Sequence, residues 1–560
     1  MYDLVIRNAR ICDGRGTAIF DGAVGIKDGR IAQVGGEVAA GREEIDGGGL
    51  VLSPGIIDSH THYDAQITWD AYATPSVSLG VTTVIMGNCG FTIAPCRPTD
   101  RDLTLRNLTQ VEGMSLEALR AGTKWGFETF PEYLDMLERI GTVPNVAAYC
   151  GHSSMRTYVM REDATTRVAS DEEIAAMKDI LREALEAGAV GFATTTNEPH
   201  NGWGGIPMPS RFADDREMRG LANTLGEAGK GLFMLTKGDK TTIPYLESLA
   251  AENGRPMMVA AMLHDPSNPP RVFEEVRQIR EARERGRQLY AQVACIPLTQ
   301  EFTLTGAYPF ESRTHWKKAI PIYGDKAALS KLYADPAFRA GVKEDLEEGL
   351  VTQFQRQWDK MEIVEVAKPE HRHLRRGNVA ELAAAEGKHP LDWMLDFGLA
   401  DDLGTLFTVQ LFNADEKEVK RLLHDPSSSI ALSDAGAHLS LLCDAGFGLY
   451  LLGRWVRDRH DFTLEEAVTA LTSAQAQVYG IKDRGCIAPG FYADLLLFDP
   501  DTVDSGPLER AHDLPTGALR LTRQPIGVHG IWINGTRVAD AEGIIANGAP
   551  PGHVLREFAA

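Results

Sequence analysis

Residues 50–62 read Leu-Val-Leu-Ser-Pro-Gly-Ile-Ile-Asp-Ser-His-Thr-His, an apolar, β-prone run that ends in two histidines. His60 and His62 are two positions apart, so on an extended strand both imidazoles point to the same side. Two neutral imidazoles on one face at the end of a strand form half of a divalent-metal site. The alternative is a pair of surface histidines, and the choice depends on whether other segments supply matching ligands.

Similar buried strand patterns recur along the chain and alternate with helical patterns. The expected strands are residues 50–57, 81–86, 145–149, 189–194, 231–235, 257–263, 288–294 and 427–433. The expected helices include residues 171–188, with Asp171 as the capping residue, and residues 243–253 and 272–286. Eight strands that alternate with helices predict an α/β fold, a closed (β/α)8 TIM barrel over residues 54–484.

Both ends of the chain have a different sequence pattern, in which short strands are separated by glycine-rich turns. These strands are expected at residues 3–7, 22–27, 30–34, 493–499 and 528–535. We expect residues 1–53 and 485–560 to pair as one small β-sandwich domain, which the barrel interrupts. Two separate β appendages are the alternative.

Residues 297–425 break the alternation between the seventh and eighth strands. They include an acidic helix expected at 340–349 and a basic, histidine-rich run at 371–376, which we interpret as a solvated face. A long insert at the mouth of a barrel predicts a lid over the site.

Composition limits the classes of partner. The chain has 560 residues and a formal net charge of -21, which argues against nucleic acid and anionic membranes. No apolar run is long enough to span a membrane, and no secretory signal is visible at the N-terminus. The seven cysteines lack the spacing of a disulfide framework, which favours reduced thiols and a cytoplasmic location. A small molecule is the expected substrate.

In barrels of this type the chemistry lies at the carboxyl ends of the strands. Asp434 follows the eighth strand. A carboxylate beside two imidazoles can hold a metal ion and accept a proton from water, whose pKa the metal lowers from 15.7 to about 7. The alternative for Asp434 is an N-cap in the following loop. Cys89, between glycines after the second strand, is either a thiolate ligand or a packing residue.

Together these motifs resemble the amidohydrolase superfamily, and specifically its D-aminoacylase branch (N-acyl-D-amino-acid deacylases, amidohydrolase 3). The matching segments are Pro54-Gly-Ile-Ile-Asp-Ser-His-Thr-His62, Gly80-Val-Thr-Thr-Val-Ile-Met-Gly-Asn-Cys-Gly90, Gly151-His-Ser-Ser-Met-Arg156, Ser433-Asp-Ala-Gly-Ala-His438 and Ile487-Ala-Pro-Gly-Phe-Tyr-Ala-Asp494. The resemblance implies one or two Zn2+ ions held by His60, His62, Cys89 and Asp434. It implies that Asp434 carries a proton from water to the leaving nitrogen.

The chain departs from this branch at the fifth and sixth strand ends. The branch has a histidine at the fifth and a Ser-His-His-Lys-like segment at the sixth, whereas this chain has Thr236-Lys237 and Leu263-His264-Asp265. Three alternatives follow. Lys237, carboxylated, and His264 replace the missing ligands; a single metal ion is held by the other four residues; or the fold persists with altered or lost activity.

Three further polar residues are candidates for contact with the substrate. His152 and Arg156 follow the third strand, and an arginine suits a carboxylate through paired hydrogen bonds. An arginine at this place can instead pair with a neighbouring acid. His438, four residues after Asp434, reaches the substrate or a ligand, or is an ordinary loop histidine.

The resulting prediction is a metal-dependent hydrolase that cleaves an amide bond, in an N-acyl amino acid or a related compound, by means of a metal-activated water. A hydrolase of cyclic amides, ureas or lactones is the alternative enzyme. A binding protein without catalysis on the same fold is the alternative class. Oligomers are common in the superfamily, so a homo-oligomer stays open, although no segment indicates an interface.

Overall fold

Eight parallel strands form the central sheet in a computed structural model of the chain, which describes residues 1–109, 113–347, 354–546 and 548–559. Their order in the sheet is β16-β12-β11-β10-β9-β8-β7-β6, so neighbours along the chain are neighbours in space, apart from the long connection to β16. The strands are β6 (Ile56–Thr61), β7 (Val81–Met86), β8 (Asn145–Gly151), β9 (Gly191–Thr195), β10 (Leu232–Thr236), β11 (Met257–Ala260), β12 (Leu289–Val293) and β16 (Ser428–Ile430).

The sheet curls until its two edge strands meet. The backbone N–H of His62, just after β6, donates to the carbonyl of Ala435 at 2.7 Å, and Thr61 and Ala435 form a parallel bridge. Ala435 follows β16, so the first and last strands of the sheet approach at their carboxyl ends. The chain therefore has an α/β fold with a curled parallel sheet, as in a TIM-like barrel.

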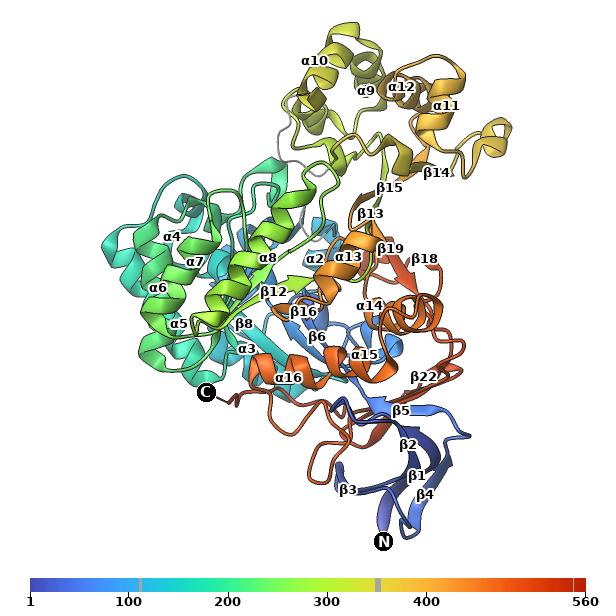
Figure 1. Cartoon of the computed structure of the whole chain (residues 1–560). Coiled ribbons are helices and arrows are strands. Elements are labelled where there is room, and N and C mark those ends of the chain that lie inside the picture. Colours follow the sequence, from blue (N-terminus) through green and yellow to red (C-terminus); the bar gives the residue numbers. More distant parts are fainter. Residues whose placement is uncertain (110–112, 348–353, 547, 560) are drawn as a thin grey trace.

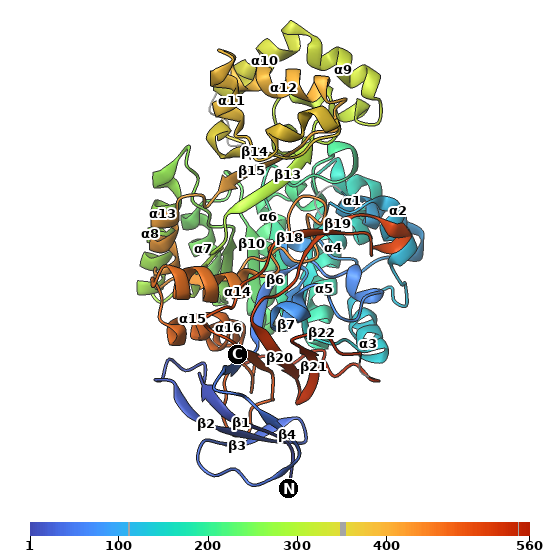
Figure 2. The same ribbon diagram turned by 90° about the vertical axis from the view of Figure 1, so that its right-hand side faces the viewer.

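Helices cover the outside of this sheet (Figure 1). They are α3 (Phe130–Ile140), α4 (His152–Met160), α5 (Asp171–Ala187), α6 (Asp215–Ala228), α7 (Ile243–Asn253), α8 (Pro269–Glu284), α13 (Glu416–Leu423), α14 (Phe447–Tyr450), α15 (Leu464–Leu471) and α16 (Ser473–Tyr479). Two further helices, α1 (Arg101–Thr109) and α2 (Leu116–Gly122), pack against each other, and α2 contacts the turn that joins β18 (Leu508–Ala511) and β19 (Arg520–Arg523) (Figure 2).

The N-cap of α5 lies one residue before the predicted position. Ser170 rather than Asp171 caps the helix, because its hydroxyl accepts from the backbone N–H of Glu173 at 3.3 Å. The Glu173 side chain in turn accepts from the backbone of Ser170 at 2.8 Å. This reciprocal pair, a capping box, satisfies two backbone donors and places Asp171 in the first turn.

Strands from both ends of the chain pair in one nine-stranded sheet. It consists of β1 (Tyr2–Ile11), β2 (Phe20–Lys27), β3 (Arg30–Val34), β4 (Gly41–Asp46), β5 (Val51–Pro54), β17 (Leu495–Phe498), β20 (Val528–Ile533), β21 (Thr536–Asp540) and β22 (Gly543–Ile544). The junction is β17, which runs antiparallel to β5. The expected joining of the termini is therefore present, whereas the sandwich arrangement stays a prediction.

The long segment before β16 has a hydrophobic core of its own, which runs from Phe302 to Leu411. Its elements are β13 (Leu298–Thr303), α9 (Lys326–Ala334), α10 (Pro336–Glu347), β14 (Met361–Glu365), α11 (Val379–Ala385), α12 (Pro390–Ala400) and β15 (Leu406–Phe412). In Figures 1 and 2 its helices lie at the end of the molecule opposite β1–β4. The expected helix at 340–349 is α10, except that its last two residues lie outside the described residues.

Helix α13 belongs to the barrel, although its residues fall inside the expected insert. Its apolar residues Val419, Leu422 and Leu423 join the core that surrounds the central sheet. All seven cysteines are unpaired, as expected from their spacing. Among the described residues, every helix is too short or too polar to cross a lipid bilayer.

Candidate metal centre

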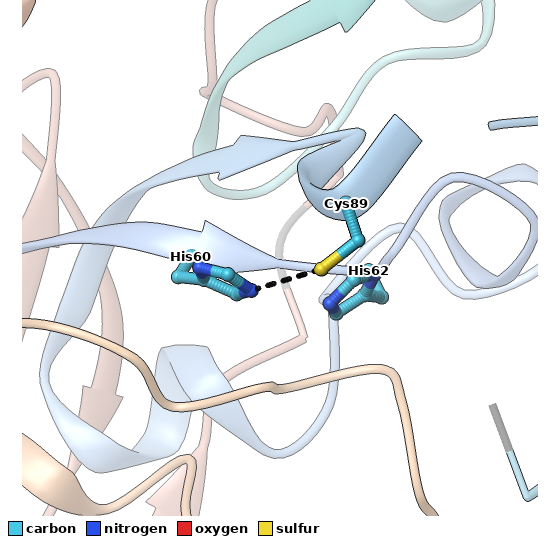
Figure 3. Close-up of side chains that lie close together, drawn as sticks. All are labelled: His60, His62 and Cys89. Atoms are coloured by element: carbon cyan, nitrogen blue, oxygen red, sulfur yellow. Dashed lines mark hydrogen bonds between the residues drawn. The ribbon is translucent and has the colours of Figure 1, made fainter. Parts of the chain in front are cut away.

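Three potential ligands meet at the carboxyl end of the sheet. His60 and His62 come from the end of β6, and Cys89 comes from the turn after β7. One ligand atom from each of the three lies within 4.8 Å of the others. Figure 3 shows both imidazoles and the thiol directed toward one another, with 3.6 Å between Cys89 Sγ and His60 Nε2. The two histidines share a face because they are two residues apart at the end of a strand.

Asp434 completes this group from the opposite edge of the sheet. Its Oδ1 lies 3.1 Å from Nε2 of His60 and 3.5 Å from Nε2 of His62. Asp434 and Cys89 both have left-handed backbone conformations, with φ of 47° and 59°. Such a conformation costs a non-glycine residue about 1–3 kcal/mol, and strain of this kind is concentrated at functional sites. The sequence predicted all four residues, and the structure brings them together.

The environment of His60 establishes which ring nitrogen faces the centre. Its Nδ1 donates to Oε1 of Gln292 on β12 at 2.6 Å, and Gln292 Nε2 lies 3.4 Å from Ser59 Oγ. Nε2 of His60 is therefore the ring nitrogen that faces the carboxylate of Asp434 and the sulfur of Cys89. Burial lowers the pKa of His60, but its hydrogen bonds with Asp434 and Cys89 outweigh burial and raise the pKa to about 10, so a proton takes this place when no metal ion does. Electron-rich atoms this close repel one another unless a cation or a proton lies between them. The donor set of two imidazoles, a thiol and a carboxylate therefore fits a divalent ion such as zinc.

We predict that Gln292→Leu weakens metal binding about 10- to 100-fold, the usual effect of removing the partner that orients a ligand histidine. Gln292 is fully buried, and leucine is similar in size but cannot accept from Nδ1 of His60. Competition with a chelator, followed by metal analysis, measures the change. Gln278→Leu, on the outer helix α8, is the matched control. Unchanged zinc affinity in the Gln292 variant contradicts the orienting role.

Electrostatics at the centre favour the ligand forms of the acids. Burial raises the pKa of the Cys89 thiol, but contacts with His60 and His62 outweigh it and bring the pKa to about 7. Burial also opposes ionisation of Asp434, yet the same two histidines hold its pKa well below the usual value for aspartate. Both acids are thus close to their deprotonated forms at neutral pH, as metal ligands must be.

At the fifth strand end, Thr236 rather than Lys237 is directed at the centre. The hydroxyl of Thr236 lies 3.1 Å from Cys89 Sγ. Lys237 lines the cavity, where its ammonium group donates to Glu275 Oε1 on α8 at 2.8 Å. Its ion pair with Glu275 engages the ammonium away from the four ligand candidates, so this position does not support Lys237 as a replacement ligand.

His264 lies outside the ligand group as well. Its ring packs 6.2 Å from that of Phe273 on α8, and it is absent from the cavity lining among the described residues. Neither ring nitrogen has a hydrogen-bond partner within the described ranges. The side chain that follows β11 is thus directed toward the helix layer, and the position of His264 does not support ligation either.

A cavity of about 210 Å³ opens in front of the four ligand candidates. Phe91, His200, Lys237, Arg271 and His438 are among its lining residues. His438 therefore lines the cavity in front of the ligand candidates, and its expected contact with a substrate stays a prediction. Loss of water around its ring, together with His62 and His60, lowers the pKa of His438 to about 4 despite the opposing effect of Asp434.

His152 and Arg156 do not reach this cavity. Both are fully buried and bind Glu217 of α6: His152 Nε2 donates to Oε1 at 2.7 Å, and Arg156 donates to Oε2. Nδ1 of His152 accepts from the hydroxyl of Thr194 at 2.7 Å. The arginine thus pairs with a neighbouring acid, which was the alternative to substrate binding, and the expected contact of these two residues with substrate is corrected accordingly.

We predict that Glu217→Gln lowers the free energy of unfolding by about 3–5 kcal/mol, because it leaves the buried charge of Arg156 without a counter-ion. Urea denaturation monitored by circular dichroism measures the loss. Burial opposes the charge of Glu217, but His152 and Arg156 lower its pKa. The stabilisation is therefore present above the pKa of glutamate in the unfolded chain and is lost as the pH falls. Unchanged stability with a raised KM would instead support a substrate contact.

Two residues of the site were not predicted. Gln292 is a polar residue inside an otherwise apolar strand, which is a recognisable signal of an inward polar contact. His200 follows β9 and lines the cavity, five residues beyond the end of the strand. A loop residue that far beyond a strand has no periodic pattern from which the direction of its side chain can be predicted.

Comparisons with known proteins find similar enzymes over the whole length of the chain. D-aminoacylase from Alcaligenes xylosoxydans xylosoxydans is 28% identical over 566 residues, covering 100% of this chain and 98% of that protein. The crystal structure of N-acyl-D-glutamate deacylase from Bordetella bronchiseptica, in complex with zinc and a phosphonate inhibitor that mimics the tetrahedral intermediate, is 26% identical. It matches with a TM-score of 0.68, over 99% of this chain and 100% of that one.

A structure of D-aminoacylase, described for its binuclear metal centre, matches with a TM-score of 0.67 and 25% identity over the whole of both chains. The family model described as "Amidohydrolase family" matches residues 43–539. The resemblance to the D-aminoacylase branch is thereby confirmed. Because this match covers most of the chain, and the fold and the four converging ligand candidates agree with it, the chain belongs to the amidohydrolase family.

Proposed function

We propose that the protein is a zinc-dependent hydrolase that cleaves the amide bond of N-acyl amino acids. The observation that carries this proposal is the convergence of His60, His62 and Cys89 with the carboxylate of Asp434 at the mouth of one cavity. The names of the similar proteins make N-acyl-D-amino acids the first substrates to test.

His60, His62, Cys89 and Asp434 would hold one or two zinc ions. Bound there, zinc supplies Lewis acidity, which polarises the scissile carbonyl and makes water a stronger acid. His60 is kept in its ligand orientation by Gln292. Phe91, which stacks on the ring of His62 at 6.0 Å, keeps bulk water from one side of the group.

Asp434 is the proposed proton carrier. Its carboxylate accepts the proton that water loses on attacking the carbonyl carbon, and it then gives that proton to the leaving nitrogen. The products are a carboxylic acid and an amino acid, so no other reactant is required. Its partial exposure, 16% of the side chain, lets Asp434 face both the ligands and the cavity.

Two cationic side chains in the cavity, those of Lys237 and Arg271, favour a substrate that carries a carboxylate. Both line the cavity, and both donate to the same oxygen of Glu275, at 2.8 Å and 3.3 Å. An ammonium group has three donors, so Lys237 retains N–H groups for a second acceptor. We therefore place the carboxylate of the substrate near these two cations, in the role that Arg156 was expected to have.

We predict that Lys237→Met raises KM for an N-acyl amino acid about 10-fold, the usual effect of losing a charge-assisted hydrogen bond. The corresponding N-acyl amine, which has no carboxylate, should show an unchanged KM. Steady-state kinetics with both compounds measure the difference, and Lys230→Met, at an exposed position, is the control. An equal effect on both compounds contradicts the placement of the carboxylate.

Further parts of the proposal concern the surroundings of the site. Residues 297–425 act as a lid, because Leu298, Gln300, Tyr308 and Phe412 from this segment line the cavity. Residues 1–53 and 485–560 form the accessory β-sandwich domain.

The unpaired cysteines support a cytoplasmic location. We propose no nucleic-acid partner, because of the net charge of -21, and a homo-oligomer is to be tested by light scattering.

The deciding experiment combines metal analysis with a substrate screen. We expect stoichiometric zinc, and hydrolysis of at least one member of a matched set of N-acyl-D- and N-acyl-L-amino acids. Turnover of hydantoins, ureas or lactones in place of these compounds would favour the alternative enzyme. A protein that carries zinc but hydrolyses none of these compounds, or that carries no metal, would indicate a binding protein and would contradict the proposal.

A further inference from the structure

The imidazole of His200 is held in one orientation by the end of strand β9. Its Nδ1 lies 2.8 Å from the hydroxyl oxygen of Thr195. That hydroxyl donates to the carbonyl of Thr236 at 3.2 Å, so its hydrogen is engaged there. The same oxygen also accepts from the backbone N–H of Asn197 at 3.1 Å. A hydroxyl that donates to Thr236 accepts from His200, and on this assignment the proton of the neutral ring lies on Nδ1.

The other nitrogen, Nε2, is consequently left with a lone pair. In the described part of the chain Nε2 has no hydrogen-bond partner, and the His200 side chain lines the cavity in front of the metal centre. Loss of water around the ring and the neighbouring His438 hold the pKa of His200 to about 3, despite the opposing effect of Asp434. His200 is thus a neutral acceptor at physiological pH.

The position of His200 relates it to the ligands. Its ring packs edge-on against Phe91 with 5.1 Å between centroids, and Phe91 stacks on His62 at 6.0 Å. The ring of Phe91 therefore lies between His200 and His62, a ligand of the proposed zinc ion. An acceptor at this place faces the space in which the substrate of the proposed reaction would bind.

We propose that Nε2 of His200 accepts a hydrogen bond from the amide N–H of the substrate, which restricts the enzyme to secondary amides. This inference rests on the proposed function, because it concerns the substrate of the same site. An N-acyl amino acid with an apolar side chain has one hydrogen-bond donor at neutral pH, the N–H of the bond that is cleaved. Its carboxylate and its carbonyl are acceptors, which a neutral acceptor cannot bind.

The hydrogen bond also has a consequence for the reaction. When water adds to the carbonyl carbon, the nitrogen becomes tetrahedral and its lone pair must point to the proton that Asp434 delivers. An N–H held by His200 on one side directs the lone pair to another side. His200 is thus a specificity-determining residue that also positions the leaving nitrogen.

The test compares N-acetyl-alanine with N-acetyl-N-methyl-alanine, in the enantiomer that the screen identifies, on the zinc-loaded enzyme. The second compound has no N–H. In His200→Phe, which keeps a ring beside Phe91, we expect kcat/KM for the secondary amide to fall about 10- to 100-fold, while the low value for the tertiary amide changes by less than about 3-fold. His200→Gln, whose amide oxygen is an acceptor, should recover part of the lost activity.

Thr195→Val provides a second variant, because it removes the hydroxyl that fixes the ring but leaves the imidazole. We expect it to reduce the preference for the secondary amide less than His200→Phe does. An equal loss on both substrates, in either variant, means a merely structural role and overturns the inference. Unchanged kinetics in His200→Phe overturn it too.

A measurement without turnover separates this inference from the proposed function. Zinc-loaded Asp434→Asn, labelled with ¹⁵N-histidine, is titrated with each compound, with saturation checked by calorimetry and the His200 signal assigned by its loss in His200→Gln. The Nε2 resonance should shift with the secondary amide and not with its N-methyl analogue. A wild-type enzyme that hydrolyses neither compound contradicts the proposed function, while the presence or absence of this shift still decides the role of His200.

Discussion

Replacing His60 with alanine is expected to lower kcat/KM by at least about 1,000-fold, which corresponds to about 4 kcal/mol of the activation barrier. The variant loses a ligand whose Nε2 lies 3.1 Å from Asp434 and 3.6 Å from Cys89, so the remaining ligands bind zinc more weakly. It also leaves Gln292 without the partner to which it is bonded. Metal analysis of the purified variant should show substoichiometric zinc.

His373→Ala is the matched control for this change. His373 is exposed in the short helical turn at Pro369–Leu374, and its Nδ1 donates to the carbonyl of Glu370 at 2.8 Å. We expect it to retain zinc and activity. Excess zinc should recover some activity of His60→Ala, because the other ligands are intact. Full activity of His60→Ala without added metal would mean that the proposed centre is not where catalysis occurs.

Asp434→Asn is expected to lower kcat by about 100- to 10,000-fold, the range that general acid–base catalysis contributes. Asparagine has the same shape and can still face His60 and His62, but its amide cannot take up a proton from water. We expect most of the zinc to remain, bound by His60, His62 and Cys89. Loss of kcat with retained metal therefore separates proton transfer from metal binding.

Steady-state kinetics and metal analysis of the same preparation test this expectation. KM should change less than kcat, because the proposed carboxylate contacts at Lys237 and Arg271 are intact. An Asp434→Asn enzyme with more than a tenth of the wild-type kcat would exclude Asp434 as the proton carrier. Loss of zinc and activity in parallel would assign it a structural role as a ligand only.

Local patterns predicted the strands and helices with good accuracy. Strand β7 and helix α7 begin and end at the predicted residues. Alternating apolar residues and turn residues are properties of a few neighbouring positions, so they can be read from a single sequence. Helix α13 shows the limit of this method. Its amphipathic pattern is the same whether it packs on the barrel or on the insert, and only the contacts of Val419 and Leu422 assign it to the barrel.

The sequence by itself determined the order of the strands, and it determined that His60 and His62 share a face, because the period of a strand is two residues. Only the tertiary structure decided which distant side chains meet them. Gln292 is 232 residues from His60, and Glu275, which binds the ammonium of Lys237, is 38 residues from that lysine. Such contacts depend on how the sheet curls and on which helix lies beside each strand end, and no local period encodes either.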